Sequence, residues 1–175
     1  MGGLDVETVV FFPVSLFYDR AVTLYAQHRD GILTMLPKAD VQHVGSTAIA
    51  QGLTKGDLDL QVRVPAQDFQ TALQKLGGVY APNEESIRTD SFASFKDEHE
   101  DMAVGVQLCV EGSQYDIFWK IRDVMIKHPS LREQYDALKR RFDGHPMAAY
   151  RQAKEEFFDR LMQSAEYRAM GRSPA

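Results

Sequence analysis

The chain has 175 residues, of which 44% are hydrophobic and 26% are charged, and its formal net charge is −5. This composition fits one domain, residues 1–175, with an ordinary core, and it excludes a disordered chain of low hydrophobicity. The single cysteine, Cys109, excludes an internal disulfide and fits a cytoplasmic protein. No apolar run is long enough to cross a bilayer, so we expect no membrane partner. The acidic balance disfavours nucleic acid as a partner.

The first third of the chain predicts strands and helices in alternation. Residues 9–12 form an apolar run typical of a first strand. Ser15 stands where it would cap a helix, which we expect to end near Pro37. A short strand over residues 41–44, a glycine-containing turn and a short helix over residues 48–51 follow.

Residues 57–64 predict a strand that carries two carboxylates on one face. Apolar residues occupy every second position, so Asp57 and Asp59 project from the same side. Such neighbours are roughly 7 Å apart, which lets them share one metal ion or straddle a pair. Their hard oxygen ligands suit Mg²⁺ or Mn²⁺. We predict that Asp57 and Asp59 are the catalytic and metal-binding residues. The alternative is the solvated face of an edge strand.

The turn before this strand predicts a phosphate-binding site formed by Gly45, Ser46 and Thr47. Glycine lets the backbone approach a ligand closely, and a Ser or Thr at a helix start leaves N–H groups for an anion. Lys55 would neutralise a phosphate at the mouth of the strand, unless it is only a surface lysine. His43 is an additional candidate, although a structural hydrogen bond from a buried strand is the simpler interpretation.

The order of strand, Gly-Ser turn, short helix and Asp-x-Asp strand resembles the fingerprint of the nucleotidyltransferase superfamily. A closer resemblance to the GrpB family extends over nearly the whole chain. The residues that carry it are His43-Val44-Gly45-Ser46-Thr47-Ala48, Lys55, His128-Pro129, Tyr135-x-x-Leu138-Lys139-Arg140 and Tyr150-x-x-Ala153-Lys154-x-x-Phe157. It implies an α+β fold: a nucleotidyltransferase-like mixed β-sheet core with helices packed on it. The substrate of GrpB proteins is generally unassigned, so this resemblance indicates a fold and a site more readily than a reaction. The resemblance to the superfamily implies Mg²⁺-dependent transfer of a nucleoside monophosphate from an NTP to a small-molecule or protein acceptor.

The chain departs from the resembled pattern in two ways. The family pattern has a proline after the turn and one aspartate in the strand, whereas this chain has Ala50-Gln51 and both aspartates. In the superfamily a third carboxylate on a later strand completes the site, but the matching position here is Gln107, which cannot accept a proton at neutral pH. An acid from the acidic segment 84–101, such as Asp90, Asp97 or Asp101, would have to replace it; otherwise that segment is a solvated loop or a lid.

The remaining elements support the α+β class. We expect a helix from Pro65 to about residue 77, a strand over residues 91–95 and a strand over residues 104–111. These complete a mixed sheet core within residues 1–112. Helices over residues 113–127, 130–142 and 146–167 then form a C-terminal helical segment, residues 113–175, with two capping-box-like starts at Ser113 and Ser130.

The C-terminal segment is basic and offers phosphate-binding candidates. It holds twelve of the twenty Lys and Arg residues, against nine of the twenty-five carboxylates. A basic wall facing an acidic metal strand would suit a triphosphate. The candidates are Lys120, Arg122, Lys139, Arg140 and Lys154. Solubility of the helix surfaces is the simpler explanation for any one of them.

Two functions therefore remain open from the sequence. One is a Mg²⁺-dependent nucleotidyltransferase whose partners are an NTP and an unknown acceptor. The other is a nucleotide-binding or protein-interaction module that keeps the fold without catalysis, because Gln107 replaces the third acid.

Overall fold

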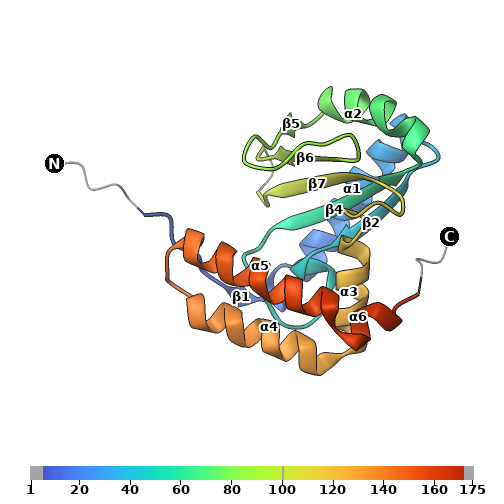
Figure 1. The fold of residues 1–175 in the computed structure, drawn as a ribbon. Helices are drawn as coiled ribbons and strands as arrows, with labels where there is room; N and C mark the ends of the chain where they lie inside the picture. Colours follow the sequence, from blue (N-terminus) through green and yellow to red (C-terminus); the bar gives the residue numbers. More distant parts are fainter. Residues whose placement is uncertain (1–5, 100, 172–175) are drawn as a thin grey trace.

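The computed structural model describes residues 6–99 and 101–171. Its main sheet has five strands in the order β2-β4-β7-β6-β5 (Figure 1). These are β2 (Asp40–Val44), β4 (Leu58–Val64), β5 (Ala81–Pro82), β6 (Phe92–Asp97) and β7 (Val104–Val110). Strands β4 and β7 run parallel, and the other neighbouring strands run antiparallel. The mixed sheet confirms the predicted α+β class.

The two faces of the sheet differ because side chains alternate along each strand. In β4, Leu58, Leu60 and Val62 are fully buried in the main core. This core lies between the sheet and two helices, α1 (Tyr18–Met35) and α2 (Phe69–Gly77). The alternate β4 positions, which include Asp59 and Arg63, therefore point to the opposite face. The predicted carboxylate face is thus directed away from the apolar core.

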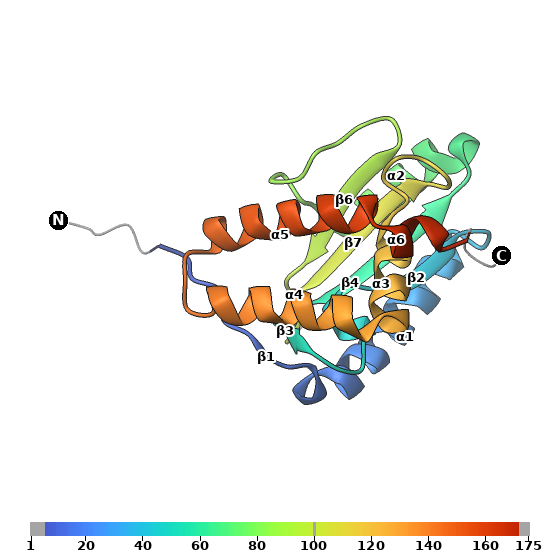
Figure 2. The ribbon, with the colours of Figure 1, turned by 60° about the horizontal axis from the view of Figure 1, so that its bottom comes forward.

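The C-terminal helices lie across this polar face of the sheet. They are α3 (Phe118–Lys127), α4 (Pro129–Phe142), α5 (Met147–Gln163) and the short α6 (Ala165–Ala169). Helices α4 and α5 lie side by side, as Figures 1 and 2 both show. They share a second apolar cluster with α3, which includes Val124, Phe157 and Leu161. The predicted C-terminal helical segment therefore forms one wall opposite the sheet.

The apolar run over residues 9–12 had predicted a first strand, but the N-terminal segment contributes no strand to the main sheet. Only β1 (Phe12–Pro13) is a strand, and it pairs antiparallel with β3 (Leu53–Thr54) in a separate two-stranded sheet. Residues before β1 bond to the turn between α4 and α5, where the Val9 N–H donates to the carbonyl of His145. The segment joins the sheet half to the C-terminal helices, so its apolar residues pack there.

Several helix starts differ from the predicted caps. A single 3-10 turn (Val14–Leu16) precedes α1, so Ser15 is not its cap. Another 3-10 turn, η2 (Ser46–Ala48), replaces the short helix expected over residues 48–51. A third, η3 (Ala66–Asp68), follows Pro65. The last predicted helix is broken at Ser164, whose hydroxyl accepts the Tyr167 N–H and starts α6.

Helix α3 begins at Phe118 rather than Ser113, because Asp116 binds a residue of the sheet and does not extend the helix. Its carboxylate accepts hydrogen bonds from Arg63 Nε (2.7 Å), Arg63 Nη2 (2.8 Å) and the Gly112 N–H (2.8 Å). Burial alone would raise the pKa of Asp116, but the bonds from Arg63 and Gly112 outweigh burial and lower it. This buried ion pair anchors α3 to β4.

Loss of this anchor is expected to destabilise the fold strongly. Asp116→Ala leaves the Arg63 guanidinium without its main buried partner, and breaking a buried pair costs roughly 3–5 kcal/mol. Urea unfolding should show this as a lower midpoint. Glu98→Ala is the control, because its pair with Lys96 is exposed and exposed pairs contribute little. Equal midpoints for both variants would contradict the anchoring role.

Candidate functional site

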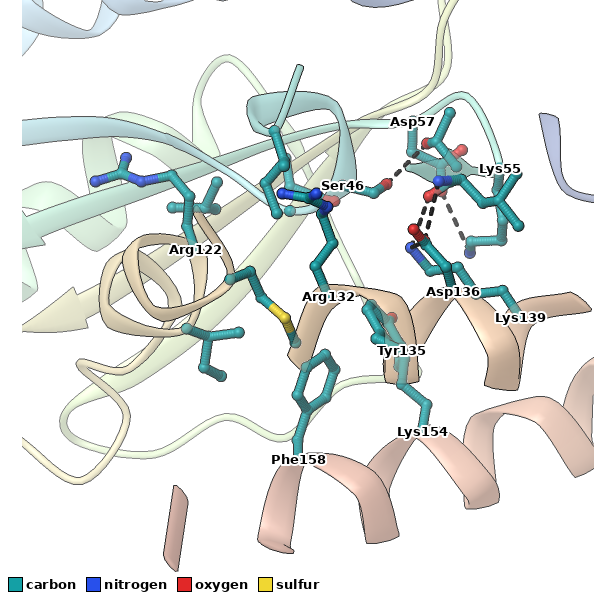
Figure 3. Close-up of a pocket in the computed structure, with 18 of the residues that line it drawn as sticks. Ser46, Lys55, Asp57, Arg122, Arg132, Tyr135, Asp136, Lys139, Lys154 and Phe158 are labelled. Atoms are coloured by element: carbon teal, nitrogen blue, oxygen red, sulfur yellow. Dashed lines mark hydrogen bonds and ion pairs between the residues drawn. The ribbon is translucent and has the colours of Figure 1, made fainter. Parts of the chain in front are cut away.

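A cavity of about 350 Å³ lies between the polar face of the sheet and helices α3, α4 and α5. Asp57, Asp59, Gly45 and Ser46 line it from the sheet side, and Lys154 lines it from α5 (Figure 3). This volume is within the usual range for small-molecule sites. The tertiary structure therefore brings most of the residues predicted from the sequence to one place.

The Asp59 carboxylate fits between two glycines. A side chain at Gly45 would overlap Asp59 Oδ2, and a Cβ at Gly105 would lie 3.0 Å from Asp59 Oδ1. Both glycines are strand neighbours of Asp59: Gly105 pairs with it in β7, and Gly45 follows its β2 partner Val44. Gly45 also has φ 74°, a conformation that favours glycine. Close packing thus fixes the direction of this carboxylate.

Asp59 carries an unfavourable charge in this position. Burial, and next the neighbouring Asp57 carboxylate, raise its pKa to about 6, while Lys154 and Lys55 act in the opposite direction. Asp57 lies just before β4 and is more exposed; its Oδ2 is 3.3 Å from Lys55 Nζ. Two adjacent carboxylates with one close lysine attract a further cation.

The donor set fits Mg²⁺ in a particular way. Within residues 6–99 and 101–171, no group of three or more His, Cys, Asp or Glu residues is arranged to hold a metal ion. Mg²⁺ commonly uses one or two carboxylates and completes its octahedron with water and substrate phosphates. Asp57 and Asp59 therefore suit a metal that arrives with a phosphate ligand, rather than one enclosed by protein groups.

The predicted phosphate turn has one residue that lines the cavity and one that is buried behind it. Ser46 lines the cavity, and its hydroxyl is 2.7 Å from Thr54 Oγ1. Thr47 is fully buried and does not line the cavity; its hydroxyl donates to the Asp57 carbonyl at 3.0 Å. The Thr47 hydroxyl is therefore committed to supporting the carboxylate strand, contrary to the predicted contact with phosphate.

His43 supports the same turn from behind. Its Nε2 is 3.1 Å from Thr47 Oγ1, and its ring stacks on Tyr25 with the centroids 5.1 Å apart. Burial, and next the charge of Arg122, lower its pKa to about 4, so the ring is neutral near pH 7. These contacts match the structural interpretation of His43, which holds Thr47 and, through it, Asp57.

The five basic candidates from the C-terminal segment have different environments. Lys139 and Lys154 line the cavity, whereas Lys120 and Arg140 do not. Arg122 lines it too, but its Nη1 donates to the His43 carbonyl at 2.7 Å and its Nε to Asp123 at 2.7 Å. Figure 3 shows Arg122 directed away from the carboxylates. Of these five candidates, Lys154 is therefore the lining cation whose charge acts on Asp59.

Lys154 and Lys139 carry the electrostatic signature of a cation-rich cavity. Burial, and next the charge of Lys55, lower the pKa of Lys154. Burial is also the main cause that lowers the pKa of Lys139 to about 8, with Lys154 and Lys55 adding to it and Asp136 opposing it. A polyanion in the cavity would relieve the repulsion among these lysines.

The candidate replacements for a third acid do not reach the site. Gln107 lines the cavity beside Asp59, but an amide cannot act as a base at neutral pH. Asp90, Asp97 and Asp101 lie outside the cavity lining, and Asp101 pairs instead with Arg20 at 2.7 Å. Glu100, in the same acidic segment, lies outside the described residues.

Helix α4 contributes cavity residues that the sequence reasoning missed. Arg132, Tyr135 and Asp136 line the cavity, and Asp136 is the third carboxylate among its described lining residues. The available signal was their spacing of three or four residues, which places Arg132, Tyr135 and Asp136 on one side of the helix. The far part of the cavity is apolar, with Ile121, Met125 and Phe158 among its lining residues.

Comparisons with known proteins agree with this architecture. The chain is 27% identical over 161 residues to a UPF0157 protein of Vibrio cholerae serotype O1, an alignment that covers 91% of this chain and 85% of the relative. The crystal structure of the conserved protein GrpB from Enterococcus faecalis superimposes with a TM-score of 0.63 at 13% identity, covering 91% of this chain and 95% of the other. It shows the same fold.

A weaker structural likeness connects the chain with the Cid1 poly(U) polymerase, at a TM-score of 0.46 and 13% identity over 70% of this chain and 40% of the polymerase. That likeness is too slight to support an argument about function. Among the described residues, no helix combines the length and apolarity that crossing a membrane requires. The family model of the GrpB protein matches residues 18–164, so this chain belongs to the GrpB family.

Proposed function

We propose that the protein binds an NTP with Mg²⁺ in this cavity and transfers the nucleoside monophosphate to an acceptor oxygen on a small molecule or a protein. The observation that carries the proposal is the placement of Asp57 and Asp59 beside the Gly45-Ser46 turn, with Lys154 on the opposite wall. This arrangement combines metal ligands, a close backbone approach and a cation for the phosphates.

The proposed reaction is an in-line displacement at the α-phosphorus. The acceptor oxygen forms a new P–O bond, the bond to the leaving pyrophosphate breaks, and the acceptor hydroxyl gives its proton to solvent water. Bound Mg²⁺ would supply Lewis-acid stabilisation of the phosphate oxygens. Asp57 and Asp59 would hold that ion, and Lys154 and Lys55 would neutralise negative charge on the leaving group.

A second function, nucleotide binding without turnover, is favoured by one specific observation. Gln107, the residue that the sequence aligns with the third acid, lines the cavity as an amide, and the third carboxylate among the described lining residues, Asp136, comes from α4. An NTP labelled at its α-phosphate distinguishes the two functions when it is incubated with the protein and a metabolite pool. A labelled product that Asp57→Asn abolishes supports transfer, whereas binding without a product supports the module.

Nucleotide binding is expected to stabilise the wild type in a Mg²⁺-dependent manner. At 100 times its Kd, a ligand adds about 2.7 kcal/mol, which shifts the Tm of a domain of this size by about 5–10 °C. Thermal unfolding with ATP, CTP, GTP and UTP, with and without Mg²⁺, measures this. Asp57→Asn/Asp59→Asn should lose the shift, and the control Asp90→Asn, outside the cavity, should keep it. No shift with any nucleotide would refute the proposal.

The metal-free protein is expected to become more stable when Asp59 is neutralised. The fold raises the pKa of Asp59 from 3.8 to about 6, so folding favours the protonated carboxyl group. The free energy of unfolding therefore falls as the pH rises from about 4 to about 6. The maximum cost at pH 7.5 is about 3 kcal/mol, because one pKa unit equals about 1.4 kcal/mol. Asp59→Asn should therefore unfold at higher urea than the wild type at pH 7.5.

The pH dependence provides the control for this stability effect. Near pH 4 the wild-type carboxylate is protonated, so the advantage of Asp59→Asn should disappear. Asp57→Asn should change the urea midpoint less, because 40% of the Asp57 side chain is exposed. A wild type more stable than Asp59→Asn at pH 7.5 without metal would show that Asp59 is a structural residue.

A further inference from the structure

Two buried side chains of α4 hold the backbone of one residue, Leu53, in the loop over residues 52–57 that leads to the carboxylate strand. Asp136 Oδ1 accepts the N–H of Leu53 at 3.0 Å, and Lys139 Nζ donates to the carbonyl of the same residue at 2.6 Å. The side chains of Lys139 and Asp136 are only 5% and 10% exposed, and their charged atoms are 3.9 Å apart. Both charges thus serve one stretch of backbone, as Figure 3 shows for the two α4 residues.

Gly52 allows this close approach. It has φ 109°, and a Cβ in its place would lie 2.8 Å from Asp136 Oδ2. The Gly52 carbonyl accepts the Val14 N–H at 2.9 Å on the other side. The loop is therefore held between the N-terminal segment and α4, and only a residue without a side chain fits beside the carboxylate.

From Leu53 the contacts lead directly to the proposed ligand groups. The next residue, Thr54, is buried, and its hydroxyl is 2.7 Å from Ser46 Oγ and accepts the Gly56 N–H at 3.0 Å. Lys55, which lies between Thr54 and Gly56 in the chain, forms the ion pair with Asp57. A displacement of Leu53 would therefore move both the phosphate turn and the start of the carboxylate strand.

We propose that Asp136 and Lys139 are positioning residues that fix this loop, and are not themselves a third metal carboxylate and a phosphate-binding lysine. The inference rests on the nucleotide function proposed above. Asp136 Oδ1 is engaged by the Leu53 N–H. Lys139 Nζ is bonded to the Leu53 carbonyl and lies 4.0 Å from the centroid of the Tyr135 ring. Both groups are thus already used within the protein, whereas Lys154 remains for the ligand.

The amide variant of Asp136 separates the two roles. Asn retains an oxygen that can accept the Leu53 N–H but lacks the charge that a metal ligand or base needs. The probe is inorganic tripolyphosphate with Mg²⁺, the part common to every NTP, measured by calorimetry. Asp136→Asn should bind it within about threefold of the wild type, and Asp136→Ala should weaken it by roughly tenfold or more, as expected for losing a hydrogen bond to a charged group.

Hydrogen exchange of the Leu53 amide reports the contact directly. Protection should persist in Asp136→Asn and fall in Asp136→Ala relative to the wild type. If Asp136→Asn loses polyphosphate binding as completely as Asp136→Ala while Leu53 remains protected, Asp136 is a ligand group and the positioning role is overturned.

A glycine pair tests the same role without changing any charge. Gly52→Ala places a methyl group against Asp136 and should weaken Mg²⁺-tripolyphosphate binding by roughly fivefold or more if loop position matters. Gly112→Ala is the matched control, because Gly112 also has positive φ (75°) but nothing lies within 4 Å of its Cβ position. It should lower the Tm through backbone strain and leave binding within about twofold.

Binding by the wild type and binding by the variants test the two proposals separately. If the wild type binds no Mg²⁺-tripolyphosphate and no NTP, the nucleotide function is refuted, and the positioning role for ligand binding falls with it. If the wild type binds but Asp136→Ala and Gly52→Ala bind equally well, the nucleotide function stands and the positioning role alone is wrong.

Discussion

The close approach of the chain around Asp59 is the constraint on which the rest of the site depends. The carboxylate occupies space that side chains at Gly45 and Gly105 would fill. Its direction is therefore set by backbone on both sides and needs no hydrogen bond from another side chain. The Asp59 carboxyl group thus faces a cavity and has a raised pKa. A charged group in this position lowers the stability of the fold, and such groups are typical of functional sites.

The cavity exists because the sheet has one apolar and one polar face. Helices α1 and α2 cover the apolar face, and α3, α4 and α5 cover the face that carries Asp59 and Arg63. Polar connections join the helices to the sheet half, among them Asp116 with Arg63, Arg122 with the His43 carbonyl, and the α4 pair Asp136 and Lys139 with Leu53 in β3. The wall of helices is thus fixed to the sheet by hydrogen-bonded charges, and the space between them can remain polar.

Neither the carboxylates nor the lysines of the cavity are fully neutralised by groups of opposite charge. Asp59 is repelled by Asp57, and Lys154 is repelled by Lys55, although the two groups of opposite sign face one cavity. A magnesium ion would neutralise the carboxylates, and phosphate groups would neutralise the lysines. The proposed metal–polyphosphate complex would therefore neutralise both sets of charges at once, which neither a free cation nor a free anion would do.

The sequence alone was sufficient for the fold class and for the sheet side of the site. The period-2 pattern of β4 placed Asp59 on the face opposite Leu58 and Leu60, and Gly45, predicted to let the backbone approach a ligand, packs against the Asp59 carboxylate. Local patterns report such features because strand alternation and glycine conformation depend on neighbouring residues. The same local reasoning placed Thr47 at the ligand, since it could not show that the Thr47 hydroxyl faces the Asp57 carbonyl.

Only the tertiary structure decided which helix residues reach the cavity. A stripe along α4 has the same spacing whether it faces a core or a cavity, so the sequence did not distinguish Asp136 and Lys139 from core or surface positions. Their partner, Leu53, is more than 80 residues away in the chain. The sequence by itself determined strands β2, β4, β6 and β7 and the carboxylate face, because those follow from short-range periodicity. The packing of α4 on Leu53 in β3 decided which helix residues line the cavity, because contacts between residues far apart in the chain leave no pattern in the sequence.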